Sequence, residues 1–245
     1  MTNQNNLSKE VNDPTGERLN ALFEAISILN QVVPQKNILH LAAQYGKLYL
    51  LKIFASQYDI NSRDEIDMEQ KTALHYAIEN NHFDTFCYLC QLGADLYSKD
   101  WFGRTPIHYA AQFAHHDKFV KRLIEREVNW NIQDDDGVTP LMLTSRPDIA
   151  ELLVEAGGDI HAVDHDGNNL LHHAAALRDL TMVQYWWSQG VNRQQLNRQG
   201  LDPWEYFIKF DGFDIFKREQ MMSHILENND TSTGNIRRIY ELLNK

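Results

Sequence analysis

Cationic side chains, cysteines and long apolar runs are all scarce in this chain of 245 residues. Lys and Arg number 23 against 34 Asp and Glu, which gives a net charge of −11. Nucleic-acid-binding proteins cluster cationic side chains to displace phosphate counterions, so nucleic acid is not an expected partner. No apolar run approaches the roughly 18 residues that predict a membrane span. The polar start also lacks the apolar segment of a Sec signal peptide, and we expect a cytoplasmic protein.

The only two cysteines are Cys87 and Cys90, which stand in the sequence FCYLC. A Cys-x-x-Cys pair occurs in redox centres and in halves of zinc sites. Zinc would require two more ligands, and a redox pair prefers a helix N-terminus, whereas this pair falls inside a predicted helix. We interpret both residues as packing or surface thiols, which suits a reducing compartment.

The sequence contains a recurring pattern, apolar-His-x-Ala. It occurs in ILHLAA, ALHYAI, PIHYAA and LLHHAA, while PLMLTS and PWEYFI replace the His with Met and Glu. The steps between these positions are 35, 33, 34, 30 and 33 residues. Such a period predicts a stack of repeats. The six positions are His40, His75, His108, Met142, His172 and Glu205.

Residue types around the pattern predict the shape of one repeat. Thr105 and Thr139 stand where an N-cap would accept a backbone N–H at a helix start. A proline follows each of them and suits the first helical position, and glycines such as Gly103 supply positive φ in the preceding turn. Each repeat should therefore consist of a turn, a short helix, a second helix and a return loop. No repeat can bury its apolar face alone, so the repeats must stack.

These repeats resemble the ankyrin repeat family. The match is carried by DWFGRTPIHYAA at 100–111, DDDGVTPL at 134–141 and DHDGNNLLHHAA at 164–175, and it covers roughly residues 36 to 228. The resemblance implies an all-α, ankyrin-repeat solenoid of five to six helix-turn-helix repeats with finger loops. It also implies that the motif histidines are structural and hydrogen-bonded within and between repeats, at His40, His75, His108 and His172.

The predicted organisation has a cap at each end of the repeats, because terminal repeats need a polar outer face. We expect a disordered N-terminus at 1–13 and an N-terminal capping helix at 14–35. Ankyrin repeats 1–5 should occupy 36–202. A degenerate sixth repeat and a helical C-terminal cap should occupy 203–245.

Several positions depart from the regular repeat. The segment SRDEIDMEQK at 62–71 is about two residues longer than the pattern and strongly charged. The sequence SRPD after Thr144 replaces a longer turn, so the first helix of the fourth repeat should be short. Met142 and Glu205 lack the imidazole, so the joints around them should be weaker or differently satisfied. Large side chains at apolar repeat positions predict that four tryptophans are core residues: Trp130, Trp186, Trp187 and Trp204.

The resemblance also implies a binding surface, because the fingers and first helices of ankyrin proteins line one concave face. Its variable positions are the residues around the finger glycine and near the end of the first helix. Aromatic and Arg side chains dominate interface hot spots, and neighbouring carboxylates favour a basic partner. The alternatives are that the rings pack on the neighbouring finger and that the carboxylates form a solvated face. The candidate partner-binding residues are Tyr45, Trp101, Phe102, Arg104, Gln112, Phe113, Asp135, Asp136, His165 and Asp166.

We therefore predict a non-catalytic module that binds a protein carrying an apolar anchor flanked by basic residues. The sequence contains no GxGxxG, P-loop, GxSxG or HExxH motif, and we expect no cofactor and no bound metal. The alternative is a cryptic enzyme or metal-dependent site in the acidic fingers or the aromatic C-terminal region. A small ankyrin solenoid with an Asn- and Gln-rich start looks like the effectors that intracellular bacteria inject into host cells by type IV secretion. Oligomeric state is left open.

Overall fold

The computed structural model describes residues 38–113 and 115–210. The predicted disordered N-terminus (1–13), the predicted capping helix (14–35) and residues 211–245 of the predicted C-terminal cap lie outside these described residues. The chain consists of two compact units, residues 1–106 and residues 107–245. In the described ranges every regular element is a helix, and one isolated β-bridge pairs Arg63 with Thr72.

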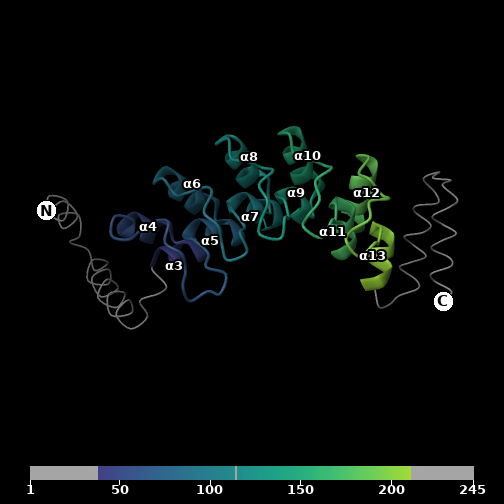
Figure 1. The fold of residues 1–245 in the computed structure, drawn as a ribbon. Helices are drawn as coiled ribbons and strands as arrows, with labels where there is room; N and C mark the ends of the chain where they lie inside the picture. The colour runs from purple at the N-terminus through teal and green to yellow at the C-terminus, as the bar shows by residue number, and fades with distance from the viewer. Residues whose placement is uncertain (1–37, 114, 211–245) are drawn as a thin grey trace, which may run out of the picture. The chain divides into compact units, whose positions relative to one another are not determined.

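Two helix pairs build the first unit. They are α3 (Ile38–Gln44) with α4 (Leu48–Phe54), and α5 (Ala73–Glu79) with α6 (Phe83–Gln91). The first helices α3 and α5 pack side by side, as do the second helices α4 and α6, so the pairs form two layers (Figure 1). Helices of seven to nine residues are marginal in isolation, so burial stabilises them. The fully buried core side chains of this unit include Leu39, Leu51, Leu74, Ile78, Phe86 and Leu89.

The second unit continues the same arrangement. Its first helices are α7 (Pro106–Phe113), α9 (Pro140–Leu143), α11 (Leu170–Ala176) and α13 (Pro203–Phe210). Its second helices are α8 (Lys118–Ile124), α10 (Pro147–Glu155) and α12 (Leu180–Ser188). Helix α11 packs against α9, α12 and α13, while α10 packs against α8 and α12. Among the described helices, none is long and apolar enough to cross a membrane.

The first helix of the fourth repeat is short, as the sequence predicts. Helix α9 has four residues and ends where Thr144 adopts an extended backbone, with φ −76° and ψ 134°. The Thr144 hydroxyl accepts the Arg146 N–H at 3.2 Å, and Pro147 then starts α10 at a position where its missing N–H costs nothing. The trimmed turn therefore replaces the last turn of a normal first helix.

The prediction that four tryptophans are core residues is right for one of them. Trp186 is 1% exposed, but Trp130, Trp187 and Trp204 are half-buried. The Trp187 and Trp204 rings meet edge to face at 5.8 Å, and the Arg193 guanidinium lies 4.7 Å from the Trp187 ring centre. Tryptophan is amphipathic and too large to be enclosed by one short helix pair, so apolar repeat position alone overestimates its burial.

Both cysteines lie inside α6, as the sequence predicts. Cys90 is buried and Cys87 is half-buried, and the two are thiols rather than a disulfide. Their position away from the helix N-terminus removes the usual means of stabilising a reactive thiolate.

Candidate surface for a protein partner

A single side chain shapes each finger of regular length. In the third repeat, Asp100 Oδ1 accepts the N–H groups of Phe102 at 2.9 Å and Arg104 at 2.8 Å, and its own N–H donates to the Arg104 carbonyl at 2.9 Å. Asp and Asn form such turns because their short side chains reach the backbone two to four residues later. The corresponding residues of the second unit make the same bonds, at Asp134, Asp164 and Asn197.

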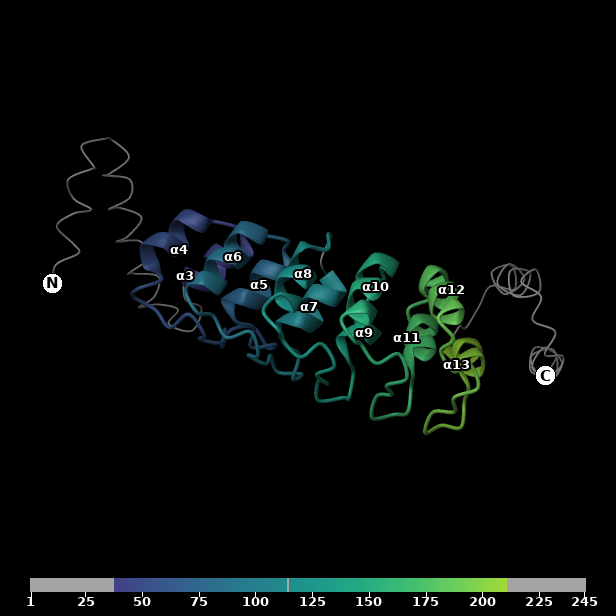
Figure 2. The same cartoon turned by 90° about the horizontal axis from the view of Figure 1, so that it is seen from above.

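Neighbouring fingers are joined by backbone hydrogen bonds. In the first unit the Trp101 N–H donates to the Glu69 carbonyl at 2.8 Å. In the second unit the His165 N–H donates to the Asp136 carbonyl at 2.9 Å, and the Arg198 N–H donates to the Asp166 carbonyl at 2.7 Å. Figure 2 shows that within each unit the loops project away from the helices. We call the tips at 64–71 and 99–104 the finger edge of the first unit, and those at 134–138, 164–168 and 197–201 the finger edge of the second unit.

The four motif histidines are at most 1% exposed. The Nε2 atom of His40 lies 2.7 Å from the Ser62 carbonyl, that of His108 lies 3.1 Å from the Val138 carbonyl, and that of His172 lies 3.1 Å from the Leu201 carbonyl. These carbonyls belong to the following repeat, so each such bond ties one repeat to the next. Within its own repeat, His75 Nδ1 accepts the N–H of Thr72 at 3.1 Å.

The hydrogen bonds of His172 fix which of its ring nitrogens carries the proton. Its Nδ1 accepts the Asn169 N–H at 3.2 Å, so Nε2 carries the proton that it donates to the Leu201 carbonyl. Burial lowers the pKa of His172 from its usual 6.5, because the charged imidazolium would lose its hydration. The ring is therefore neutral at pH 7.

The two positions that lack the motif His keep the bond within the turn. Thr139 is the N-cap of α9, and its N–H donates to Met142 Sδ at 3.4 Å. The Asp202 N–H donates to Glu205 Oε2 at 3.1 Å. A thioether and an ionised carboxylate have no proton to donate, so neither side chain can supply the bond to the following repeat that His108 and His172 make. Met142 therefore lacks the bond that His108 and His172 make, and the segment that follows the Glu205 helix lies outside the described residues.

The aromatic candidate residues of the first unit are exposed to solvent. Trp101 is 62% exposed and Phe102 is 44% exposed, both on the third finger. The Arg104 guanidinium lies 5.7 Å from the Phe102 ring centre, a distance at which the cation and the ring face attract each other. Tyr45, which directly follows α3, is also 61% exposed, and no described contact joins it to the third finger.

The candidates of the second unit fall into two groups. Asp135, Asp136, His165 and Asp166 are all exposed and occupy the tips of two hydrogen-bonded fingers. Gln112 and Phe113 end α7 and are half-buried, with the Phe113 ring 5.6 Å from Tyr109.

The close approach of the two acidic fingers depends on a glycine. Gly137 has φ +80°, and a Cβ atom there would lie 2.6 Å from Cδ2 of His165. Only glycine fits both conditions, because other residues are strained at this φ and would collide with the imidazole. The His165 imidazole therefore packs directly against the turn of the neighbouring finger.

The sequence reasoning missed the enlarged finger of the second repeat as part of this surface. Its tip carries Met68, 88% exposed, and Ile66, 46% exposed. The available signal was two large apolar residues inside an otherwise charged insertion at 62–71.

An ionic network anchors this enlarged finger. Lys71 is 7% exposed, and its Nζ lies 2.8 Å from Glu69, 2.9 Å from Glu79 and 3.8 Å from Asp67. Burial alone would lower the pKa of Lys71, but the bonds to Glu69 and Glu79 outweigh it and raise the pKa. The Tyr76 hydroxyl lies 2.8 Å from Asp64 Oδ2 and 2.7 Å from Asp67 Oδ2, and burial together with these carboxylates raises its pKa.

A second buried network lies under the fifth finger and was also missed. Asp164 Oδ2 lies 2.9 Å from His173 Nε2 and accepts Asn168 Nδ2 at 3.0 Å, while Asn197 Nδ2 donates to Asn168 Oδ1 at 2.8 Å. Burial alone would raise the pKa of Asp164, but the bonds from His173 and Asn168 lower it to about 2. The network links the roots of adjacent fingers and leaves their tips open.

Short helix pairs joined by hydrogen-bonded fingers, with side chains displayed at the finger tips, define a helical repeat protein. The family described as "Ankyrin repeats (3 copies)" matches residues 10–100 and 97–164. This chain belongs to the ankyrin repeat family, and its fold is an ankyrin-repeat solenoid. Ankyrin repeats are protein–protein interaction modules, since stacked repeats present an extended binding surface.

Similar proteins match a part of this chain. Neurogenic locus notch homolog protein 1 of Cricetulus griseus is 30% identical over 143 residues, which cover 57% of this chain and 6% of that protein. The Homo sapiens protein of the same name is 29% identical over 143 residues, with the same coverage. Inversin of Gallus gallus is 33% identical over 153 residues, which cover 60% of this chain and 13% of inversin. The matched part is therefore a small fraction of each relative.

Proposed function

We propose that this chain is a non-catalytic binding module that holds a partner protein on its finger edge. One observation carries the proposal: Trp101 and Phe102 stand 62% and 44% exposed on a finger that is fixed by Asp100 and tied to its neighbour. Large rings on a fixed turn bind without a large loss of conformational freedom, and such rings supply hot spots in protein interfaces.

The charges of the finger edge select the partner's chemistry. In the second unit the exposed carboxylates of Asp135, Asp136 and Asp166 occupy adjacent fingers, and the whole chain carries a net charge of −11. An apolar anchor of a partner protein fits the aromatic tips of the first unit, and its Lys or Arg residues fit the carboxylates of the second unit. Opposite charges also speed the encounter.

One observation supports a function without catalysis. The motif histidines are buried, and His172 uses both ring nitrogens in structural hydrogen bonds.

The setting is a further part of the proposal. The Asn- and Gln-rich beginning of the chain favours an effector that a bacterium translocates by type IV secretion and that acts in the host cytoplasm. The thiol state of Cys87 and Cys90 suits that reducing compartment. A reporter fused before the last 20 residues tests the idea: delivery into host cells that requires the secretion system is expected, and its absence refutes the setting alone.

Capture of partners from a eukaryotic lysate tests the binding function. The wild type is compared with a Trp101→Ala/Phe102→Ala variant and with Tyr49→Ala, which removes a ring that is 53% exposed on α4. Mass spectrometry should find proteins that the wild type and Tyr49→Ala retain and the double variant loses. Equal recovery by all three refutes the site, and circular dichroism checks that each variant is folded.

A further inference from the structure

We propose that the enlarged finger of the second repeat, residues 64–71, is a docking element whose apolar tip receives an apolar side chain of a partner peptide bearing Lys or Arg next to it. The tip consists of Ile66 and Met68. The inference rests on the proposed function and deepens it, because it identifies contact residues outside the repeat's regular variable positions.

The tip combines large apolar side chains with high exposure. Met68 is 88% exposed and Ile66 is 46% exposed, and the finger that carries them is joined to the aromatic finger through the Trp101 N–H and the Glu69 carbonyl. Exposed apolar side chains that gather on one surface mark contact sites. Methionine adapts its shape to different apolar partners, which suits the receipt of a side chain from a flexible peptide.

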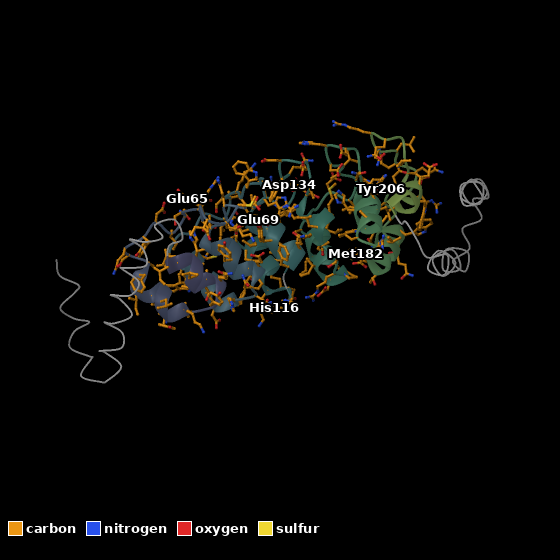
Figure 3. The ribbon with its side chains drawn as sticks, turned by 90° about the horizontal axis from the view of Figure 1, so that it is seen from below. Glu65, Glu69, His116, Asp134, Met182 and Tyr206 are labelled. Atoms are coloured by element: carbon orange, nitrogen blue, oxygen red, sulfur yellow. The ribbon has the colours of Figure 1, made fainter. Side chains whose placement is uncertain are left out.

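Carboxylates surround the tip and select a cationic flank. Residues 63–79 contain five carboxylates and two cationic side chains, Arg63 and Lys71. Buried contacts with carboxylates already occupy Lys71. Glu65 is exposed and has no ion pair among the described residues, and Figure 3 shows Glu65 and Glu69 along the same edge of the first unit. A peptide with Lys or Arg beside its apolar residue would therefore be favoured over a neutral or acidic one.

Hydrogen bonds and an ion pair at its base fix the shape of the enlarged finger. The Asp64 N–H donates to the Lys71 carbonyl at 2.8 Å and closes the loop. The Tyr76 hydroxyl then bridges Asp64 and Asp67, and Lys71 joins the loop to Glu79 at the end of α5. A loop already fixed in its bound shape loses little conformational freedom on binding, which distinguishes a docking element from a loose insertion.

Selection of 12-residue peptides from a random phage-displayed library tests the inference on the immobilised full chain. We expect enriched peptides to carry a large apolar residue within a few positions of Lys or Arg. Synthetic copies are then titrated by fluorescence anisotropy against the wild type, Ile66→Ser/Met68→Ser, each single variant, and Leu92→Ser. Leu92 is the matched control, because it is 40% exposed at the end of α6. The double variant should weaken binding by about tenfold or more, and Leu92→Ser by less than about twofold.

Other outcomes overturn the inference without deciding the proposed function. Peptides that lose binding to Trp101→Ala/Phe102→Ala but still bind Ile66→Ser/Met68→Ser would show that the enlarged finger is not a contact. Enrichment of peptides without the apolar-basic pattern, or of none, would also overturn it, while the lysate capture still decides the proposed function. If the wild type sediments as a dimer and Ile66→Ser/Met68→Ser sediments as a monomer, a second copy of this chain would be the occupant of the enlarged finger instead. Unchanged melting of the variants excludes unfolding as the cause.

Discussion

Replacing His172 by methionine should weaken the joint between the fifth repeat and the segment that follows it. The substitution borrows the residue that the chain itself uses at the equivalent position of the fourth repeat, Met142, so its size and its place in the turn are known to be tolerated. It removes the proton that Nε2 donates to the Leu201 carbonyl and replaces the Nδ1 acceptor with a sulfur.

The expected loss follows from these two bonds. The Leu201 carbonyl still accepts the Asn197 N–H at 3.0 Å, so the substitution does not leave it bare. The net cost is then that of one lost and one weakened hydrogen bond, about 1.5 kcal/mol. In a chain of this size that loss lowers Tm by about 3–6 °C.

The reciprocal change, Met142→His, serves as the matched experiment. One imidazole nitrogen would accept the Thr139 N–H in place of the sulfur, and the N–H of the other would donate to the Asn168 carbonyl. That carbonyl corresponds to the one of Leu201 and already accepts the Asp164 N–H at 3.0 Å. One added hydrogen bond should raise the free energy of unfolding by about 1 kcal/mol.

Chemical denaturation at pH 7.5, followed by circular dichroism, measures both variants. His172→Met should lower the free energy of unfolding and Met142→His should raise it. Wild-type stability in His172→Met, or destabilisation by Met142→His at an unchanged fold, would refute the view that these histidines tie the repeats together.

Three further predictions concern pH and local geometry. Acidification below about pH 6.5 should destabilise the wild type more than His172→Met, because the unfolded state binds a proton that burial keeps off the folded imidazole; equal pH slopes in denaturation at pH 7.5 and 5.5 would contradict this. Tyr76→Phe should cost about 2 kcal/mol, since it removes the one hydroxyl proton that lies between two carboxylates, and amide hydrogen exchange at 64–71 should accelerate; unchanged exchange there would show that the hydroxyl does not hold the finger. Gly137→Ala should lower Tm more than Gly200→Ala, because both have positive φ but only the first places a Cβ against His165; equal losses would mean that the contact with the imidazole is unimportant.

The repeat architecture could be predicted from the sequence because the period fixes local chemistry. The starts of α7 and α9 follow from a Thr-Pro pair and an apolar pattern, and the short α9 follows from the missing residues after Thr144. What repeat position alone could not predict was the burial of single large side chains. Trp186 and Trp187 are adjacent in one helix, yet one is enclosed and the other is half-buried, because burial depends on the neighbouring repeat.

The candidate surface was predictable where it follows the repeat and not where it departs from it. Trp101 and Phe102 occupy regular finger positions, so their exposure could be anticipated. Ile66 and Met68 lie in an insertion that no other repeat contains, and their orientation depends on the buried contacts of Lys71 and Tyr76. Those contacts join residues whose pairing a spacing rule does not reveal.

Hydrogen–deuterium exchange on the chain, alone and with a captured partner, tests the central claim most directly. The finger edge binds the partner in this account, so backbone amides at 64–71 and 99–104 should exchange more slowly in the complex, while those of the second helices α4 and α6 should not change. Protection confined to the second helices, with the finger amides unaffected, would contradict it.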